Sequence, residues 1–200
     1  MKRNVAILIF PDVEILDFTG PFEVFAVTDE LAGGQLFHTY TVAELPGSVR
    51  ARNGLKVVPD FTLETAPQPQ LLIIPGGAGT RPLLQRPSLL EWICQRHRRA
   101  ELTISVCTGS LVLAKAGLLH GLRATTHYDS MAELSALAPD SSIDSTVRFT
   151  DNGQILTSAG IAAGIDVSLH AVAKLHGDAI ADKTARQMEY RWHNDGGVRR

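Results

Sequence analysis

The sequence predicts an α/β protein in which a mostly parallel sheet carries helices on both faces. Short apolar runs alternate with segments of helical periodicity along nearly the whole chain, which is the pattern of repeated strand–helix units. The runs at residues 5–10 and 71–74 are apolar without interruption, as expected of strands buried on both sides. With 200 residues and 44% hydrophobic content, the chain can bury one sizeable core. We therefore expect a single domain over residues 1–193 and a flexible tail at 194–200.

The first half of the chain contains strands, helices and one hairpin. Pro21 suits the first turn of a helix at residues 20–31, because its missing N–H has no helical partner there in any case. The pair Asn53-Gly54 is a two-residue turn signal, and it predicts a hairpin of residues 48–52 and 55–59. The remaining elements expected here are strands at residues 5–10, 37–43 and 71–74 and a helix at 83–97.

The second half repeats the alternation and ends in helices. An apolar strand at residues 102–106 leads into Cys107, and a helix is expected from 108 to 118. Asn152-Gly153 marks a second hairpin, between residues 146–150 and 155–158. The remaining elements expected are a short strand at 123–126 and helices at 130–137, 163–175 and 179–190.

Composition excludes several classes of partner. The formal net charge is −2, and no long Lys/Arg run resembles a nucleic-acid footprint, so we expect no nucleic acid and a small-molecule ligand instead. No apolar stretch approaches the length of a membrane span, and the first apolar run is a strand rather than a signal peptide. Two cysteines outside a C-x-x-C pair form neither a disulfide framework nor a zinc site, which indicates a reducing, cytoplasmic setting and no metal.

Cys107 lies where an apolar strand meets a glycine and a helical pattern, in the stretch T-I-S-V-C-T-G. A turn of the form x-Cys-x-Gly holds its cysteine in a sharp bend, so that the side chain projects from the end of the sheet. The start of a helix would favour the thiolate and lower the pKa of the thiol. Free cysteines are also common core residues, so the spacing leaves both a nucleophile and a buried filler open. Cys94, in mid-helix, is expected to be structural.

Three segments should meet at the carboxyl ends of the strands, where ligands bind in such sheets. They are the loop at residues 11–20, the P-G-G-A-G loop at 75–79, and Cys107 itself. The glycines either make a tight turn only, or they expose backbone N–H groups. In the second case Gly77 and Ala78, together with Thr108, would form an oxyanion-type site beside the thiol.

Five motifs together resemble the ThiJ/PfpI superfamily, whose members are class I glutamine-amidotransferase-like. They are I-L-D-F-T-G-P-F-E-V-F, I-I-P-G-G-A-G, S-V-C-T-G-S-L-V-L-A-K-A-G-L-L, A-T-T-H-Y and T-S-A-G-I-A-A-G-I-D, in order over residues 4–190. The resemblance implies a flavodoxin-like sandwich, a homodimer, and a cysteine at a nucleophile elbow. It also implies a hydrogen bond from that cysteine to an acidic residue of the first-strand loop, and Asp17 occupies the matching position.

Within the superfamily, the motifs are most similar to isonitrile hydratases and to the amidotransferase-like domains of AraC-type regulators. Members regarded as peptidases carry histidine after the nucleophile, where this chain has Thr108, so a protease is disfavoured. Asp17 and Thr108 match the isonitrile hydratases. The resemblance thus implies a cofactor-free, cysteine-dependent hydro-lyase, in which an isonitrile becomes an N-substituted formamide through a thioimidate on Cys107, with Asp17 as proton donor.

The sequence leaves alternatives open for the function and for the roles of single residues. AraC-type regulators continue into a DNA-binding domain of about one hundred residues, and the end of this chain at Arg200 disfavours a stand-alone regulator. A glyoxalase or deglycase, or a non-catalytic metabolite or redox sensor, would use the same Cys107. Asp17 could instead cap a helix, and His127 could line the cleft or serve only as a hydrogen-bonded structural residue. Acids expected on helix faces or in solvent are Glu14, Glu23 and Asp166.

Overall fold

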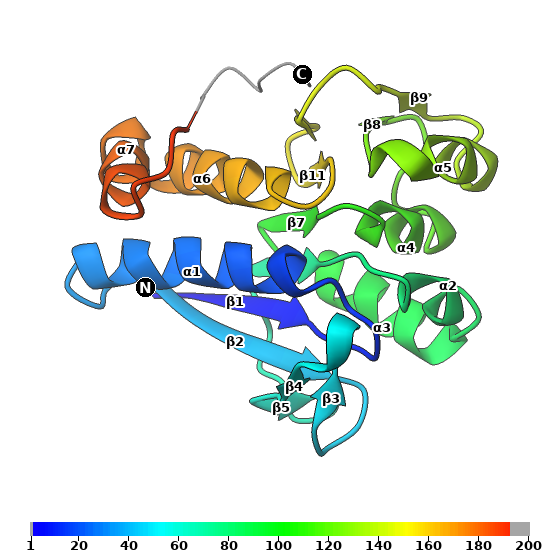
Figure 1. Ribbon diagram of the computed structural model, residues 1–200, viewed down its shortest axis with the longest axis horizontal. Coiled ribbons are helices and arrows are strands. Elements are labelled where there is room, and N and C mark those ends of the chain that lie inside the picture. Colours follow the sequence, from blue (N-terminus) through cyan, green and yellow to red (C-terminus); the bar gives the residue numbers. More distant parts are fainter. Residues whose placement is uncertain (1, 193–200) are drawn as a thin grey trace.

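The computed structural model describes residues 2–192, which form a central seven-stranded sheet flanked by helices on both faces (Figure 1). The strand order is β10-β11-β7-β6-β1-β2-β5, and every pairing is parallel except that of β10 with β11. The strands are β1 (Arg3–Leu8), β2 (Phe37–Ala43), β5 (Phe61–Thr62), β6 (Leu71–Ile74), β7 (Leu102–Ser105), β10 (Phe149–Asp151) and β11 (Ile155–Ser158). This architecture confirms the predicted fold class.

Two small sheets lie beside the central one. Strands β3 (Val49–Arg50) and β4 (Lys56–Val57) form an antiparallel hairpin around the 3-10 turn η1 (Arg52–Gly54). Strand β8 (Arg123–Ala124) pairs in parallel with β9 (Ser142–Ile143) and does not join the central sheet. The hairpin predicted at Asn53-Gly54 is therefore present. The hairpin predicted at Asn152-Gly153 is formed by β10 and β11 of the central sheet.

The helices form two groups (Figure 1). Helices α1, α6 and α7 pack against one another, while α4 packs on β6 and β7 and contacts α2 and α5. Their bounds are α1 (Ile15–Leu31), α2 (Thr80–Leu83), α3 (Pro87–His97), α4 (Gly109–Lys115), α5 (Met131–Leu137), α6 (Ala163–His176) and α7 (Asp178–Gln187). None of the helices within residues 2–192 is both long and apolar enough to cross a membrane.

The centre of the sheet is the core, and its connections create a crevice. All residues of β6 and β7 are buried, as is most of β1. From β1 the chain crosses through α1 to β2 on one side, whereas from β6 it crosses through α2 and α3 to β7 on the other. The loops after β1 and β6 therefore diverge, which opens a crevice at the carboxyl ends of neighbouring strands. Asp17, Gly77 and Cys107 follow β1, β6 and β7 at this edge.

Several boundaries differ from the sequence-based expectations. Helix α1 begins at Ile15 rather than residue 20, so Pro21 lies inside it and not in its first turn. The helix expected at residues 83–97 begins only at Pro87, because Pro87 starts α3 and drives the preceding Arg86 out of helical geometry (φ −114, ψ 84), and the short helix α2 before it was not anticipated. The short strands β5 and β9 were not anticipated. The tail expected at 194–200 lies outside the described residues.

Candidate functional site

Cys107 occupies the sharp turn between β7 and α4. Its φ of 55° lies in the left-handed region that non-glycine residues rarely adopt. Its N–H donates to the carbonyl oxygens of Ser158 (3.2 Å) and Ala159 (3.3 Å). Its own carbonyl accepts from the hydroxyls of Thr126 (2.9 Å) and Ser110 (3.1 Å). These hydrogen bonds hold the strained backbone of Cys107 from both sides.

Two glycines let the surrounding backbones approach the elbow. A Cβ on Gly109 would lie 1.9 Å from the carbonyl oxygen of Ile74, so only glycine lets α4 pack this closely on β6. A Cβ on Gly76 would lie 2.6 Å from the amide nitrogen of Thr108 and 2.8 Å from Oδ2 of Asp17. The glycine at each position therefore serves close packing around the thiol as well as the turn itself.

Asp17 is completely buried in the first turn of α1. Its Oδ2 accepts a hydrogen bond from the amide of Gly76 at 3.0 Å, across 59 residues of sequence. Its Oδ1 is also buried and has no hydrogen-bonding partner among the described residues. Glu14, not Asp17, occupies the N-cap position, and its side chain forms no capping bond. The helix-capping interpretation of Asp17 is therefore wrong, and its carboxyl is directed at the β6 and β7 loops.

The thiol and the carboxyl change each other's proton affinity. Burial raises the pKa of Asp17 to about 7, with a further rise from nearby Glu14, against lowering by the Gly76 amide and the Cys107 thiol. Burial, and then the charge of Asp17, raise the pKa of Cys107, while the amide and hydroxyl of Thr108 oppose that rise. The lowered thiol pKa expected from the helix start is thus outweighed. The resting thiol keeps its proton, and Asp17 takes the negative charge above about pH 7.

The glycine loop supplies one available backbone donor. The amide of Gly77 donates to Oγ1 of Thr108 at 2.9 Å, so it cannot serve as the oxyanion donor that the sequence suggested. The amide of Ala78 has no partner among the described residues and borders the same cavity as Cys107. Ala78 and Thr108 both border the cavity, so their role as oxyanion donors stays a prediction, while Gly77 positions the Thr108 hydroxyl.

A cavity of about 270 Å³ opens above Cys107. It brings together all the expected site residues except buried Asp17, and it adds residues that the sequence did not suggest. Its lining consists of Glu14, Arg52, Gly77, Ala78, Arg81, Cys107, Thr108, His127, Asp129, Ser130 and Ile161. A larger hollow of about 580 Å³, beyond the loop at residues 11–12, does not include Cys107. The cavity at the thiol suits a small substrate.

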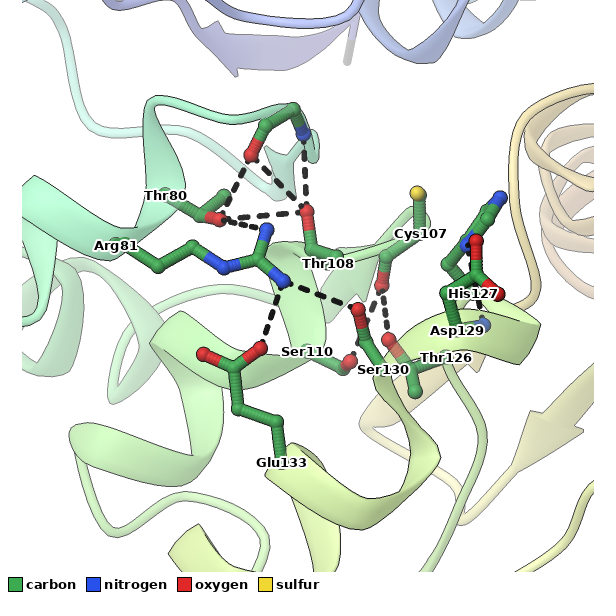
Figure 2. Close-up of polar contacts among 11 residues, drawn as sticks. Thr80, Arg81, Cys107, Thr108, Ser110, Thr126, His127, Asp129, Ser130 and Glu133 are labelled. Atoms are coloured by element: carbon green, nitrogen blue, oxygen red, sulfur yellow. Dashed lines mark hydrogen bonds and ion pairs between the residues drawn. The ribbon is translucent and has the colours of Figure 1, made fainter.

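Two ion pairs border this cavity. Glu14, expected in solvent, pairs with Arg52 at 2.6 Å and is only 15% exposed. Arg81 of α2 reaches across to Glu133 of α5 at 2.7 Å and also donates to Ser130 at 3.1 Å (Figure 2). The residue pairs are 38 and 52 positions apart in sequence, so no local pattern could have revealed them. They connect the hairpin and α5 to the loops that carry the site.

His127 fulfils both roles considered for it. Its Nδ1 accepts a hydrogen bond from the amide of Asp129 at 3.3 Å, which assigns the proton of the neutral ring to Nε2. Its ring also borders the cavity. A Cβ on Gly160 would lie 2.2 Å from Cδ2 of His127 and 3.3 Å from Sγ of Cys107, so both side chains lie next to Gly160.

Three other residues that were expected outside the site do not border the cavity. Sγ of Cys94, in α3, faces the carbonyl of Ala116 at 3.5 Å, and burial raises its pKa. Glu23 is exposed on α1. Asp166 lies in the first turn of α6 as expected, but it is buried and paired with Arg148 and with the hydroxyl of Tyr190. Asp166 is therefore one partner of an internal ion pair and not a solvated acid.

Comparison with known proteins assigns the chain to one family. The model of the DJ-1/PfpI family matches residues 3–174. The chain belongs to the DJ-1/PfpI family. It is 37% identical over 190 residues to an isonitrile hydratase of Pseudomonas putida, covering 95% of this chain and 79% of that protein. It is 31% identical over 189 residues to the HTH-type transcriptional regulator CdhR of Pseudomonas aeruginosa, covering 94% of this chain but only 55% of the regulator.

Solved DJ-1/PfpI structures agree with the fold. A ThiJ/PfpI family protein from Pseudomonas syringae superposes with a TM-score of 0.85 at 30% identity, covering 96% of this chain and 77% of that one. Drosophila melanogaster DJ-1beta superposes with a TM-score of 0.84 at 18% identity, covering 96% of this chain and 100% of that one. The second likeness concerns the fold alone.

Proposed function

We propose that this DJ-1/PfpI protein is an isonitrile hydratase-like lyase, which adds water to an isonitrile to give an N-substituted formamide. The observation that carries the proposal is that Cys107, in a strained turn, and the buried carboxyl of Asp17 shift each other's pKa, while Oδ1 of Asp17 has no hydrogen-bonding partner among the described residues. The similarity to an isonitrile hydratase over 95% of the chain supports it. The position after the cysteine is Thr108, so the site lacks an adjacent histidine.

The first half of the reaction forms a thioimidate. Asp17, ionised above about pH 7, takes the thiol proton of Cys107 as Sγ forms a bond to the terminal carbon of the isonitrile. The carboxyl then returns this proton to the same carbon. The product is an enzyme-bound thioimidate with a C–H bond and a carbon–nitrogen double bond. The unpaired Oδ1 of Asp17 suits this proton transfer, because no competing donor occupies it.

The second half releases the formamide. Water adds its oxygen to the thioimidate carbon, and a proton goes to the nitrogen. The carbon–sulfur bond then breaks as the hydroxyl proton passes through Asp17 to the departing sulfur, which restores the thiol and leaves the N-substituted formamide. The amides of Ala78 and Thr108 are the donors suited to the developing oxygen charge. His127 is proposed to contact the substrate, and the sequence of steps requires neither metal nor cofactor.

A metabolite sensor is the second candidate, and the likeness to HTH-type regulators favours it. In that case the cavity above Cys107 would bind a small molecule without turning it over. A glyoxalase or deglycase would share the elbow and direct Cys107 at an aldehyde carbon instead. All three functions place a small molecule at the same thiol, so substrate turnover distinguishes them.

The test compares cyclohexyl isocyanide with methylglyoxal as substrates for the wild type, Cys107→Ala and Cys94→Ala. We expect the wild type to form N-cyclohexylformamide, detected by mass spectrometry, and Cys107→Ala to form none. Cys94→Ala should match the wild type, because Cys94 lies in α3 away from the cavity. Turnover of methylglyoxal alone would indicate the glyoxalase or deglycase. Binding of cyclohexyl isocyanide without turnover of either compound would indicate the sensor.

We further propose that the protein is a homodimer, as the family resemblance implies. A hollow of about 360 Å³ between α1 and the β4 region supports this, since Phe18, Phe22, Val57 and Val58 line it together with Thr19, Glu23, Thr41 and Asp60. Val58 is 75% exposed and Leu16 on α1 is 39% exposed. An apolar area of this kind is typical of a protein–protein contact.

A further inference from the structure

We propose that a second pocket, beside the cavity at Cys107, holds the substituent on the isonitrile nitrogen and favours flat, uncharged groups such as an aromatic ring. This substituent pocket has a volume of about 370 Å³ and is lined by His127, Tyr128, Arg148 and residues 159–162. The inference rests on the proposed function and deepens it, because it names the class of isonitrile that the site would accept.

The substituent pocket adjoins the cavity at the thiol. His127 and Ile161 line both spaces, and Figure 2 shows His127 beside Cys107. Gly160 lines the substituent pocket, and a Cβ on it would lie 3.3 Å from Sγ of Cys107, so one wall of the pocket is within contact distance of the thiol. The substituent of an isonitrile is joined to the nitrogen, one atom beyond the carbon that Sγ attacks. It can therefore occupy this pocket while the carbon stays at the sulfur.

The polarity of the two spaces favours the substituent pocket for a hydrocarbon group. Charged side chains border the cavity at the thiol, namely those of Glu14, Arg52, Arg81 and Asp129. A hydrocarbon group placed against them would remove their water without replacing its hydrogen bonds, which costs free energy. Among the described residues that line the substituent pocket, only Arg148 carries a permanent charge, while Tyr128, Ile161 and two alanines supply apolar surface. A hydrocarbon substituent is therefore better accommodated in this pocket.

Arg148 brings no uncompensated charge to the substituent pocket. Its Nε donates to Oδ2 of Asp166 at 2.8 Å, and its Nη2 donates to the same oxygen. Asp166 is only 3% exposed, so its carboxylate is shielded from water. An anionic substituent would meet this carboxylate together with the guanidinium, and it would gain little for the water that it loses. A neutral aromatic ring loses less water, and its face can contact the guanidinium.

Tyr128 provides an aromatic wall. It begins the 3-10 turn η2 (Tyr128–Ser130) and is 70% exposed. Its ring centroid lies 4.4 Å from that of His127, with the two planes inclined by 36°. The His127 ring is itself held, because its Nδ1 accepts from the amide of Asp129 at 3.3 Å. A flat ring in the pocket would stack on Tyr128 in an offset arrangement, which a saturated ring of similar size does not.

The first test compares kcat/KM for phenyl and methyl isocyanide in the wild type, Tyr128→Ala and Leu45→Ala. We expect Tyr128→Ala to lower kcat/KM for phenyl isocyanide about tenfold more than for methyl isocyanide, because a methyl group has no face to stack on the ring. Leu45→Ala is the matched control, since Leu45 is 68% exposed but lines the larger hollow of about 580 Å³. It should stay within about twofold of the wild type for both substrates.

A second variant fills the substituent pocket. Ala162 is exposed, lines this pocket and does not border the cavity at the thiol. Ala162→Trp should therefore lower kcat/KM for phenyl isocyanide about tenfold more than for methyl isocyanide. A third substrate, 4-isocyanobenzoate, tests the charge, and the wild type should use it no better than phenyl isocyanide. Thermal melting checks that each variant is native.

Alkylation of Cys107 separates a failure of the pocket from a failure of the proposed function. Iodoacetamide and N-phenyliodoacetamide carry the same reactive group, and peptide mass mapping distinguishes Cys107 from Cys94. We expect Tyr128→Ala and Ala162→Trp to slow the phenyl reagent about tenfold relative to iodoacetamide.

Hydration with equal losses for phenyl and methyl isocyanide in both variants would overturn the inference alone. A preference of about tenfold for 4-isocyanobenzoate would also overturn it, because it would indicate an uncompensated positive charge in the pocket. If the wild type hydrates no isocyanide, the proposed function fails, and slower phenyl alkylation in the two variants would still support an aromatic subsite beside Cys107. Absence of both hydration and this alkylation effect would overturn both proposals.

Discussion

At the scale of single residues, the buried carboxyl of Asp17 links activity to stability. Burial raises its pKa from 3.8 to about 7 in the folded protein, whereas the unfolded chain keeps the ordinary value. Between these values the folded state binds more protons than the unfolded state, so the free energy of unfolding falls as pH rises from about 4 to about 7. Above pH 7 the full cost of the buried charge is present. The same charge is needed to accept the thiol proton.

We therefore predict that Asp17→Asn is more stable than the wild type and much less active. Asparagine keeps the shape and an acceptor for the Gly76 amide but carries no charge, so it should gain up to about 4 kcal/mol of stability at pH 8 and little at pH 4. Isonitrile hydration should fall about 100-fold or more, since the amide cannot exchange the proton. Urea unfolding at the two pH values and kcat/KM measure these changes.

The wild-type pH profile and a second variant serve as controls for Asp17. The wild-type kcat/KM should decrease as pH falls through about 7, because protonated Asp17 cannot take the thiol proton. Asp17→Glu keeps the charge but displaces the carboxyl by about 1 Å, so its activity should also fall, by about 100-fold. Wild-type turnover in the asparagine variant would remove Asp17 from the proposed mechanism.

At the scale of elements, burial on both faces made the central strands predictable. The strands β2 and β6 were located from sequence to the residue, and the bounds of β6 coincide with the ends of an uninterrupted apolar run. The sequence-based start of helix α1 lay five residues too late. The turn before Pro21 contacts the β6 loop, and no local sequence pattern reveals that contact. Strands of two residues, such as β5, carry too little pattern to be found.

The site residues divide in the same way, into those that a local sequence pattern reveals and those that depend on distant contacts. Cys107, Thr108 and Ala78 were predictable because parallel strands bring the residues after them to one edge. Asp17 came from the family motif, and only the structure shows that it faces the thiol. The places of Glu14 and Arg81 in the site were missed, because their ion-pair partners lie 38 and 52 residues away in sequence.

The packing of α4 on β6 gives a prediction at this scale. Gly109→Ala should destabilise the protein by about 3 kcal/mol or more, because its Cβ would lie 1.9 Å from the Ile74 oxygen and α4 would have to move off the sheet. Gly117→Ala is the matched control, since its Cβ would meet nothing within 4 Å and costs only the strain of φ 76°, about 1 kcal/mol. Equal loss in both variants, measured by urea unfolding, would contradict the close-packing argument.

At the scale of the whole molecule, α1 connects the site to the proposed dimer contact. One side of α1 places Asp17 against the β6 and β7 loops, while Phe18 and Phe22 border the hollow shared with Val57 and Val58. Single exposed apolar residues are common on protein surfaces, but here several gather around one concavity. A second copy covering it would bury the exposed Val58 and restrain the helix that positions the carboxyl.

We predict that light scattering gives twice the 21.6 kDa chain mass at micromolar concentration, and that Val58→Glu shifts the mass toward the monomer. A buried glutamate without a partner costs several kcal/mol, enough to separate an ordinary interface. Leu45→Glu is the control, because Leu45 is similarly exposed, at 68% against 75%, but lies outside the hollow between α1 and β4. A dimer that survives Val58→Glu would place the contact elsewhere, and a monomeric wild type throughout a dilution series would refute the dimer itself.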